Sequence, residues 1–312
     1  MKLGFLYAGQ GSQKAGMGQA FYEAEPEFRA VFDAAPVDFD LKEVCFTGGD
    51  GKLDDTRYTQ PCMVAFAVGV TRLLHREGIV PAYAAGLSLG EYSALHCAGV
   101  FDDRTAIELA AFRGAAMAKA AEGLDCAMIA VLGLDREPLL AACREAAALG
   151  TVEIANYNCP GQLVLGGERS AVEKAAELAK EKGAKRCMPL RVSGPFHTSL
   201  LKPAGDALRE RLAGLTLGPM EIPVLFNTLG GLMGEGDTIP ALLERQVQCS
   251  VYLEDTIRRM AELGVDTSVE IGPGKVLSGF VRKTAPEIKT YAVEDPAGLA
   301  AVTAATVPPE IP

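Results

Sequence analysis

Five residues, Gly86-Leu87-Ser88-Leu89-Gly90, stand between a short apolar run and a helical pattern. Residues 83–87 are apolar enough for a buried strand, and residues 89–98 have the periodicity of a helix. A Gly-x-Ser-x-Gly sequence between strand and helix makes a sharp turn that lifts the serine hydroxyl above a sheet. The helix N-terminus behind the serine favours developing negative charge. The junction predicts a nucleophilic Ser88 on an α/β fold, with a plain turn that opens a helix as the alternative.

Short apolar runs alternate with helical patterns along most of the chain. Strands are expected at 3–7, 83–87, 223–226 and 267–271, and helices at 17–34, 61–77, 89–98, 104–121 and 241–260. Strands separated by helices favour a parallel sheet covered on both faces. Residues 296–312 are rich in alanine and proline and are expected to be loosely held.

The order of the expected elements changes between residues 124 and 196. Strands are expected at 127–132, 152–157, 162–165 and 186–192, with helices at 137–148 and 170–183. The resulting order, βαββαβ, is the ferredoxin-like pattern. The sequence predicts a small ferredoxin-like subdomain, residues 124–196, inserted into a larger subdomain made of residues 1–123 and 197–312.

Composition argues against several classes of protein. The 312 residues can bury a substantial core, and 40 acidic against 30 basic side chains give a formal charge of −10. Such an acidic chain is poorly suited to wrapping nucleic acid or lying on an anionic membrane. The most apolar stretch, residues 61–70, is too short to cross a bilayer, and the N-terminus lacks a secretory-signal pattern. The eight cysteines are scattered without metal-ligand spacing, so we expect a cytoplasmic protein without a bound metal.

A nucleophilic serine needs a base, and the chain has three histidines. His96 lies on the same expected helix as Ser88, roughly 12 Å along its axis, and is too distant to reach back. His75 ends another expected helix and is expected to cap it at the surface. His197 follows a strand and a Gly-Pro break, in the kind of loop where catalytic groups collect. Elimination favours His197 as the base, and a structural loop histidine is the alternative.

Arg113 lies among apolar and small residues in the helix expected at 104–121. An unpaired buried charge is very costly, so this guanidinium needs a partner. An internal ion pair or a snorkelling side chain would satisfy it. A substrate carboxylate would also do so, because a guanidinium grips a carboxylate with two hydrogen bonds. The residues alone favour neither alternative strongly.

A second glycine-rich turn, Gly9-Gln10-Gly11-Ser12-Gln13, follows the first expected strand. It lacks the lysine of a phosphate-binding P-loop and the spacing of a dinucleotide-binding turn. Its backbone N–H groups are candidates for binding an oxyanion instead.

Taken together, these motifs resemble the malonyl-CoA:acyl-carrier-protein transacylases and the related acyltransferase domains of polyketide synthases. The resemblance covers about residues 3–295 and includes both glycine-rich turns. It also rests on Thr59-Gln60-Pro61, residues 86–95, Arg113-Gly114 with Met117, and residues 127–131, 156–162, 192–197, 245–247 and 270–274. So many ordered matches are far more specific than one Gly-x-Ser-x-Gly.

The resemblance implies an α/β-hydrolase-like core with an inserted ferredoxin-like subdomain. It implies that Ser88 carries the acyl group and that His197 is the base. The backbone N–H groups of Gln10 and Leu89 would form the oxyanion hole. The main-chain carbonyl of Gln246 would orient the histidine, so that no aspartate is needed.

The same resemblance implies the substrate contacts. Arg113 would bind the free carboxylate of a malonyl group, while Gln60, Asn158 and Gln162 match further polar positions of the family's site. The residue before the nucleophile is usually histidine in the family and is Leu87 here. This change removes a polar neighbour of the serine, so the resemblance does not fix the fine selectivity between acyl groups. Ala8 replaces a usual proline, a change from which we expect little.

The implied reaction is transfer of malonyl from malonyl-CoA to the phosphopantetheine thiol of acyl carrier protein, supplying fatty-acid synthesis. No bound cofactor, nucleic acid or membrane is implied, and a monomer is expected. A trans-acting polyketide-synthase acyltransferase is one alternative, and a serine thioesterase or acyl hydrolase is another. The latter would normally show an acidic triad member between Ser88 and His197, and would have no use for Arg113. A non-catalytic subunit that docks the carrier is a third alternative.

Docking raises a question of charge. Carrier proteins of this kind are usually acidic, so a chain of charge −10 would repel them unless it has a local basic patch. Candidates for such a patch are Lys185, Arg186, Lys275, Arg282 and Lys283. Taken singly, each is expected to be an ordinary solvated side chain.

Overall fold

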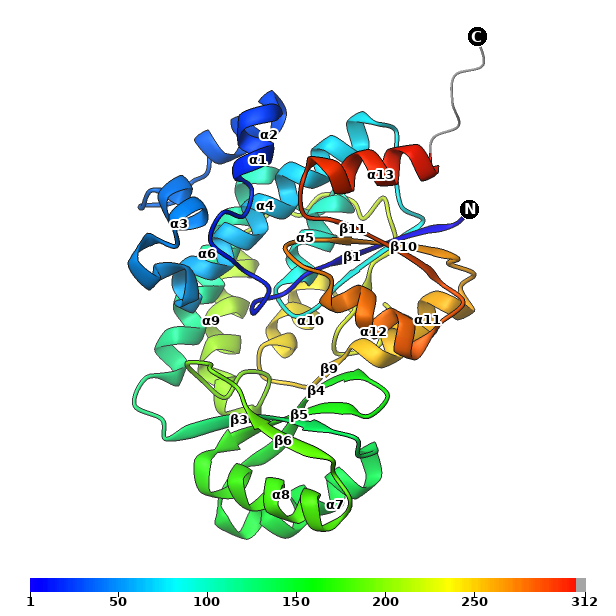
Figure 1. Ribbon diagram of the computed structural model, residues 1–312. Coiled ribbons are helices and arrows are strands. Elements are labelled where there is room, and N and C mark those ends of the chain that lie inside the picture. Colours follow the sequence, from blue (N-terminus) through cyan, green and yellow to red (C-terminus); the bar gives the residue numbers. More distant parts are fainter. Residues whose placement is uncertain (307–312) are drawn as a thin grey trace. The chain divides into compact units, whose positions relative to one another are not determined.

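The structure is a computed structural model that describes residues 1–306 (Figure 1). The chain forms two compact units. Unit 1 comprises residues 1–114 and 216–226 together with the chain from Arg258 onward, and unit 2 comprises residues 115–215 and 227–257. The subdomain boundaries predicted at residues 124 and 196 stay a prediction.

Unit 1 is built on a four-stranded parallel sheet with the strand order β11-β10-β1-β2. β1 (Leu3–Tyr7) pairs with β10 (Thr267–Ile271) on one side and with β2 (Tyr83–Gly86) on the other, and β11 (Lys289–Val293) forms an edge. β10 is buried along its whole length, which is typical of parallel strands covered on both faces. The predicted α/β fold with a parallel sheet is confirmed.

The other elements of unit 1 are mostly helices. They are α1 (Gln19–Ala24), α2 (Pro26–Asp33), α3 (Leu41–Thr47), the 3-10 helix η1 (Gly49–Asp54), α4 (Thr56–Arg76), α5 (Gly90–Cys97), β7 (Leu225–Phe226), α12 (Val276–Thr284) and α13 (Pro296–Thr306). α6 (Asp103–Ala121) and α11 (Leu253–Glu262) run across the division between the units. None of the helices within residues 1–306 is long and apolar enough to cross a membrane.

The single helix predicted over residues 17–34 is wrong, because α1 and α2 are separate helices. They are divided at Glu25, whose backbone is extended at φ −119° and ψ 106°. Pro26 follows, and a proline disfavours helical geometry in the residue before it. Pro26 is itself the first residue of α2, where a missing N–H breaks no helical hydrogen bond.

α4 begins at Thr56, five residues before the predicted start at Pro61. Asp55 caps this helix by accepting a hydrogen bond from the backbone N–H of Arg57. Pro61 lies inside the helix, where it lacks a donor for the i−4 carbonyl. The earlier start puts Thr56 and Gln60 on one helix, four residues apart and therefore on the same face.

Unit 2 contains a five-stranded sheet with the order β6-β3-β5-β4-β9. Its strands are β3 (Cys126–Leu132), β4 (Val152–Cys159), β5 (Gln162–Glu168), β6 (Arg186–Pro189) and β9 (Val251–Tyr252). The first four pair antiparallel, and β9 pairs parallel with β4. α7 (Arg136–Ala146) and α8 (Arg169–Glu181) share an apolar core with the sheet, which includes Leu139, Leu165 and Val172. The chain order β3-α7-β4-β5-α8-β6 agrees with the predicted βαββαβ pattern.

The remaining elements of unit 2 are two helices, two single 3-10 turns and a two-residue strand. They are η2 (Ala147–Leu149), η3 (Ser199–Leu201), α9 (Lys202–Ala213), β8 (Gly231–Leu232) and α10 (Ile239–Gln246). The single helix predicted over residues 241–260 is wrong, because α10 and α11 are separated by β9. Pairing with β4 outweighs local helical pattern here, and the Ser250 hydroxyl adds a hydrogen bond to the carbonyl of Ile154, 2.7 Å away.

The loosely held C-terminus predicted for residues 296–312 is also corrected in part. Residues 296–306 form α13, which buries Leu299 and Val302. Alanine has a high helix propensity, and Pro296 is tolerated because it stands at the first position of the helix. Residues 307–312 lie outside the described part of the chain.

Candidate active site

Ser88 stands on the turn between β2 and α5 and has a left-handed backbone, with φ 52°. The backbone on either side is fixed, since the N–H of Leu87 donates to Tyr7 O at 3.0 Å and that of Gly90 donates to Leu87 O at 2.9 Å. A Cβ on Gly90 would lie 2.1 Å from Tyr7 O, so the close approach of α5 to β1 requires glycine. The turn therefore has the sharp geometry predicted for a nucleophile elbow.

Two backbone N–H groups near this turn are free to bind a ligand. Within the described residues, neither the N–H of Gln10 nor that of Leu89 donates a hydrogen bond to a protein acceptor. Leu89 precedes the first residue of α5, where the helix dipole favours negative charge. These are the two donors that the resemblance described above implies for an oxyanion hole, an assignment that stays a prediction.

Arg113 is the largest fully buried side chain in the described structure and is 1% exposed. Its guanidinium donates to Oγ of Ser88 at 3.0 Å and to Oε1 of Gln60 at 2.8 Å. The ring of Tyr92 lies 5.4 Å from the guanidinium carbon, within the range of a cation–π contact. Burial lowers the pKa of Arg113 from its usual value, while Tyr92 and Glu91 oppose the shift. The group stays cationic, because arginine does not lose its proton in proteins.

A chain of hydrogen bonds extends from Arg113 to the glycine-rich turn of residues 9–13. The Gln60 amide nitrogen donates to Thr56 Oγ1 at 3.1 Å, and the Thr56 hydroxyl donates to Gln10 Oε1 at 2.6 Å. Both Thr56 and Gln60 are fully buried. The guanidinium, the nucleophile and the Gln10 turn therefore belong to one network inside unit 1.

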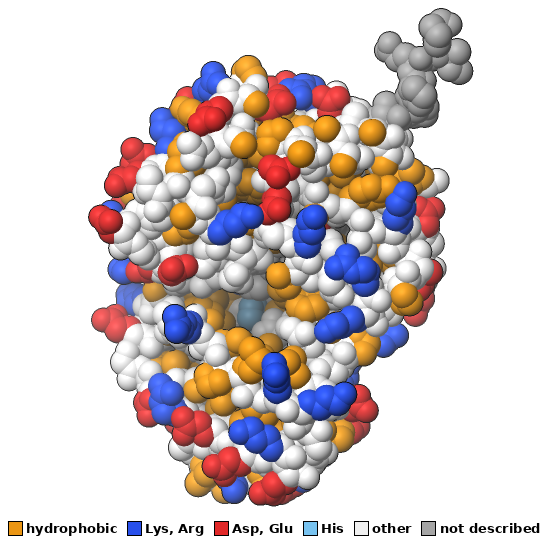
Figure 2. Space-filling view, viewed as in Figure 1, with side chains coloured by type: hydrophobic (Ala, Val, Ile, Leu, Met, Phe, Trp, Pro, Cys, Tyr) orange, Lys and Arg blue, Asp and Glu red, His pale blue; other side chains and the backbone are white. Residues whose placement is uncertain are grey.

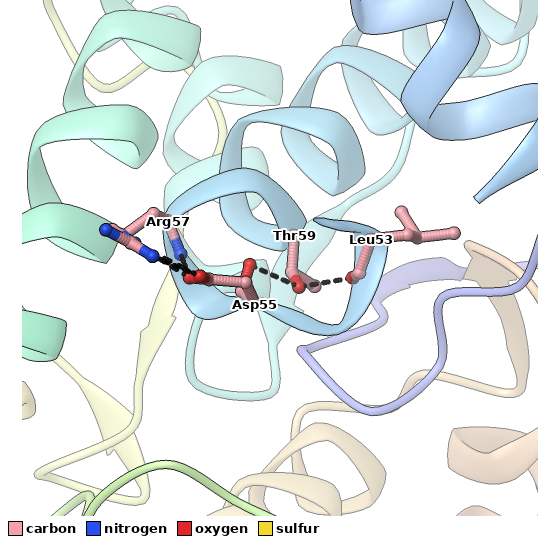
Figure 3. Close-up of polar contacts among 4 residues, drawn as sticks. All are labelled: Leu53, Asp55, Arg57 and Thr59. Carbon is pink, nitrogen blue, oxygen red and sulfur yellow. Dashed lines mark hydrogen bonds and ion pairs between the residues drawn. The ribbon is translucent and has the colours of Figure 1, made fainter. Parts of the chain in front are cut away.

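The N-terminus of α4 supports this network (Figure 3). The Arg57 side chain pairs with the Asp55 carboxylate, Nε to Oδ1 at 3.0 Å, while the Arg57 N–H donates to the same oxygen. The Thr59 hydroxyl contacts two backbone carbonyls, Leu53 O at 2.5 Å and Asp55 O at 3.0 Å. These contacts fix the first turn of α4 on both sides of Thr56.

Replacing Asp55 by asparagine is expected to lower the free energy of unfolding at pH 7 by about 0.5–1 kcal/mol. Asparagine caps a helix as well as aspartate, so the loss comes from the ion pair. The hydrogen bond from Arg57 is the largest influence on the Asp55 carboxyl and lowers its pKa from the usual 3.8. A lowered pKa stabilises the fold above the unfolded-state pKa, and this contribution disappears as pH falls through the folded-state value.

Urea unfolding of wild type and Asp55→Asn at pH 7 and near pH 3 measures this contribution. The difference between the two proteins should shrink at the lower pH. A difference that is the same at both pH values would mean that the ion pair contributes nothing.

In unit 2, His197 is buried and its Nδ1 lies 2.7 Å from the backbone carbonyl oxygen of Gln246. A carbonyl oxygen only accepts hydrogen bonds, so Nδ1 carries the proton and Nε2 is left as an acceptor. The His197 N–H also donates to Val247 O at 3.2 Å. Among residues 1–306, three non-glycine residues have a positive φ, namely Asp50, Ser88 and His197. Such strain is concentrated at functional sites, and here it occurs at both predicted catalytic residues.

The two remaining polar positions of unit 2 lie at a strand junction. Asn158 is near the end of β4, and Gln162 is the first residue of β5. The side-chain oxygen of Asn158 is buried without a hydrogen-bond partner in the described structure. A buried polar atom of this kind needs an explanation, and a substrate contact would supply one.

The other histidines lie elsewhere. His75 is exposed in the last turn of α4, with Nε2 3.8 Å from Cys97 Sγ. His96 Nε2 lies 2.8 Å from the Asp103 carboxylate. No group of three or more potential metal ligands was found among the described histidine, cysteine, aspartate and glutamate side chains.

Thr56, which belongs to this hydrogen-bond network, was not among the site residues predicted from the sequence. The signal was present in the spacing, because Thr56 and Gln60 are four residues apart. It was hidden by the late predicted start of α4.

Known proteins resemble this chain over nearly its whole length. The acyl transferase domain family matches residues 4–302. The chain is 41% identical over 298 residues to the malonyl CoA-acyl carrier protein transacylase of Bacillus subtilis (strain 168), covering 95% of this chain and 94% of that protein. It is 38% identical over 300 residues to the Escherichia coli (strain K12) protein of the same name, covering 95% of this chain and 97% of that protein.

Solved structures show the same relationship. The crystal structure of MCAT from Streptococcus pneumoniae is 46% identical with a TM-score of 0.92, covering 97% of this chain and 100% of that one. A malonyl-transacylase solved in complex with a type II PKS acyl-carrier protein is 37% identical with a TM-score of 0.94, covering 98% and 100%.

Fold, elbow and comparisons together define an acyltransferase. The chain belongs to the acyl transferase domain family, and within it to the malonyl CoA-acyl carrier protein transacylases.

Proposed function

We propose that the chain transfers a malonyl group from malonyl-CoA to the phosphopantetheine thiol of an acyl carrier protein, through an acyl intermediate on Ser88. The observation that carries the proposal is the hydrogen bond between the buried Arg113 guanidinium and Ser88 Oγ. A cation at the nucleophile suits an acyl group that ends in a carboxylate, and it has no function for a simple alkyl acyl group. The names of the relatives support the same substrate.

In the proposed first step, His197 Nε2 takes the proton of Ser88 as Oγ attacks the thioester carbonyl carbon. The backbone N–H groups of Gln10 and Leu89 hold the oxyanion, and each such donor is worth about 10²–10³ in rate. The carbon–sulfur bond then breaks, and coenzyme A leaves with the proton from His197. The serine now carries the malonyl ester.

In the second step the carrier thiol gives its proton to His197 and attacks the ester carbonyl. The carbon–oxygen bond breaks, and Ser88 regains the proton. Arg113 holds the distal carboxylate during both steps, while Gln60, Asn158 and Gln162 contribute polar contacts to the bound acyl group. The Gln246 carbonyl keeps His197 in the tautomer that this requires.

Transfer and hydrolysis are distinguished by the fate of the malonyl group. Purified protein is mixed with malonyl-CoA and a carrier bearing phosphopantetheine, and malonyl-carrier and free malonate are both quantified. Transfer predicts that malonyl-carrier greatly exceeds malonate. Malonate as the main product would instead identify a thioesterase and contradict the proposal.

The carrier of fatty-acid synthesis is the proposed partner. The polyketide alternative is supported by the structural relative bound to a type II PKS carrier. Comparing transfer rates to the two classes of carrier tests this part separately.

Replacing Arg113 by alanine is expected to reduce acylation from malonyl-CoA about 100-fold, because a buried charge-assisted contact is lost. Acylation from acetyl-CoA, which has no distal carboxylate, should change far less. The measurement is the ratio of the two acylation rates. Arg104→Ala, at the exposed start of the same helix, is the matched control and should keep the wild-type ratio. A wild-type ratio in Arg113→Ala would contradict the proposal that Arg113 binds the distal carboxylate.

The proposal has three further parts. The protein acts in the cytoplasm, which is supported by eight free cysteines within the described residues. It acts as a monomer, which light scattering tests. It uses no bound cofactor or metal, which activity after exhaustive dialysis against a chelator tests.

Docking must overcome the acidity of the chain. Figure 2 shows that the basic side chains on the face in view stand apart from one another, and that the same face also carries acidic and apolar side chains. Long-range attraction of an anionic carrier is therefore expected to be weak, with local contacts deciding the fit.

A further inference from the structure

Gln13 binds back to the turn that it follows, and the proposed mechanism uses neither of its contacts. Its Oε1 accepts a hydrogen bond from the Gly11 N–H at 2.7 Å, and its Nε2 donates to Asp54 Oδ1 at 3.2 Å. All three residues belong to unit 1. The Gln13 side chain therefore joins the glycine-rich turn of residues 9–13 to η1, which ends at Asp54.

The two partners of the Gln13 amide require the same orientation of it. A backbone N–H only donates, so Gly11 must face the amide oxygen. An ionised carboxylate only accepts, so Asp54 must face the amide nitrogen. Rotating the amide by half a turn would set donor against donor at Gly11 and acceptor against acceptor at Asp54. The observed orientation is the one that satisfies both partners.

The backbone at Asp54 is fixed by the residues on either side of it. Asp55 caps α4 by accepting a hydrogen bond from the backbone N–H of Arg57. The Thr59 hydroxyl contacts the carbonyl oxygens of Leu53 and Asp55, which flank Asp54 (Figure 3). The carboxylate that directs the amide therefore stands on an anchored segment.

Residues 9–12 form a β-turn, which is closed by the Ser12 N–H donating to Gly9 O at 3.4 Å. Gly11 occupies the third position with φ 104°, and Gln10 in the second position has no positive φ. This combination defines a type II turn. Rotating the central peptide group, between Gln10 and Gly11, would convert the turn to type I, and glycine accommodates both forms. The closing hydrogen bond is common to both forms and does not select between them.

The hydrogen bond to Gln13 does select, because the Gly11 N–H belongs to the central peptide group. Rotation of that group would turn the N–H away from the Gln13 oxygen and reverse a peptide dipole next to Gln10. The Thr56 hydroxyl and the Gln60 amide hold only the far end of the Gln10 side chain, several rotatable bonds from its backbone. Gln13 thus acts on the peptide group itself.

We propose that Gln13 is a positioning residue for the acylation step, which holds the turn in its type II form and so fixes the surroundings of the Gln10 N–H, the predicted oxyanion donor. The inference rests on the oxyanion part of the proposed function. An oxyanion is stabilised by dipoles that are fixed before the reaction, so a turn that samples both forms would stabilise it less. Every thioester forms its oxyanion at the same place, so Gln13 affects malonyl and acetyl groups alike, unlike Arg113.

The first test removes the contact and then restores it. Gln13→Met keeps the length of the side chain and removes both hydrogen bonds. Gln13→Glu keeps an acceptor for Gly11 but sets two carboxylates against each other, whereas adding Asp54→Asn supplies a donor and removes the repulsion. Gln19→Met is the matched control, because it removes a glutamine contact to Glu23, 3.0 Å long, from α1 of the same unit.

The readouts are the acylation rate at saturating thioester and the concentration that gives half of it, measured by rapid quench with malonyl-CoA and acetyl-CoA. Gln13→Met should lower both saturated rates about fivefold, as expected for one hydrogen bond. The half-saturating concentrations and the malonyl-to-acetyl ratio should stay within about twofold of wild type. Gln13→Glu should also be slow, and the double variant Gln13→Glu/Asp54→Asn should return to within about twofold of wild type. Gln19→Met should match wild type.

A wild-type rate in Gln13→Met would overturn the inference, as would an effect confined to the half-saturating concentration or to one of the two thioesters. A double variant that is no faster than Gln13→Glu would overturn it as well. Should Gln13→Met not fold, the comparison of Gln13→Glu with the double variant decides alone.

Gly11→Ala tests the turn type independently of Gln13. Apart from its chain neighbours, a Cβ on Gly11 would meet no described atom within 4 Å, so the exchange crowds nothing. It disfavours the positive φ and should slow both acylations about tenfold. A wild-type rate would contradict the inference. Failure of the proposed function gives a different result, because wild type itself would then form no malonyl ester or would lose it to water.

Discussion

Replacing Ser88 by alanine is expected to abolish transfer, with a loss on the order of 10⁴–10⁶ in rate. The hydroxyl is the group of this protein that forms a bond to the acyl carbon in the proposed mechanism. Serine and alanine both carry a Cβ, so the exchange adds little strain to the left-handed backbone at φ 52°, and the variant should keep the fold. Release of coenzyme A in the presence of carrier measures the rate.

Ser93→Ala is the control, because it removes a buried hydroxyl from α5, the helix that follows the Ser88 turn. It should transfer malonyl at a rate within a few-fold of wild type. Substantial transfer by Ser88→Ala would mean that another residue carries the acyl group.

Replacing His197 by asparagine is expected to lower the acylation rate by about 10³–10⁵, because the variant lacks a general base. Asparagine is preferred to alanine for this test. The backbone of His197 has φ 61°, a left-handed region that asparagine adopts more readily than alanine. Loss of activity can then be attributed to the imidazole rather than to backbone strain.

Stopped-flow release of coenzyme A, together with thermal unfolding, checks the His197→Asn result. Unfolding should be close to that of wild type. A variant that folds normally and acylates at more than about a tenth of the wild-type rate would exclude His197 as the base.

The sequence predicted elements well where local pattern and tertiary structure agree. β1 was placed correctly because it is a short, mostly apolar run bounded by turn residues, and β10 because a Gly-Pro-Gly turn follows it directly. Errors arose where one residue type is compatible with two different structures. Pro26 and Pro61 are both prolines within helical patterns, yet one ends a helix and starts the next while the other lies inside a helix.

β9 shows a second limit. Its two residues, Val251 and Tyr252, are of types that favour strands, but a pair is too short to be recognised inside a helical pattern. They become a strand because β4 offers a partner, and that information is absent from the local sequence.

The residues of the candidate site also differ in how far they could be predicted, because some belong to a local motif and others depend on contacts between distant parts of the chain. Ser88 was predictable because the elbow is a local motif, in which strand, turn and helix are consecutive. The alternatives for Arg113 could not be separated from sequence, because its contacts with Gln60 and Ser88 come from residues 53 and 25 positions away. Thr56 was missed because the start of α4 was predicted five residues too late, at Pro61, so its position on the same helix face as Gln60 was not recognised.

A malonyl ester at Ser88 is the central intermediate of the proposed mechanism. The direct measurement is intact-protein mass spectrometry after a brief pulse of malonyl-CoA, with peptide mapping of the adduct and a chase with phosphopantetheine-bearing carrier. We predict one malonyl-sized increment on the peptide that contains Ser88, absent from Ser88→Ala and lost on the chase as malonyl-carrier appears. An increment on another peptide, or an adduct that the carrier does not remove, would contradict the account.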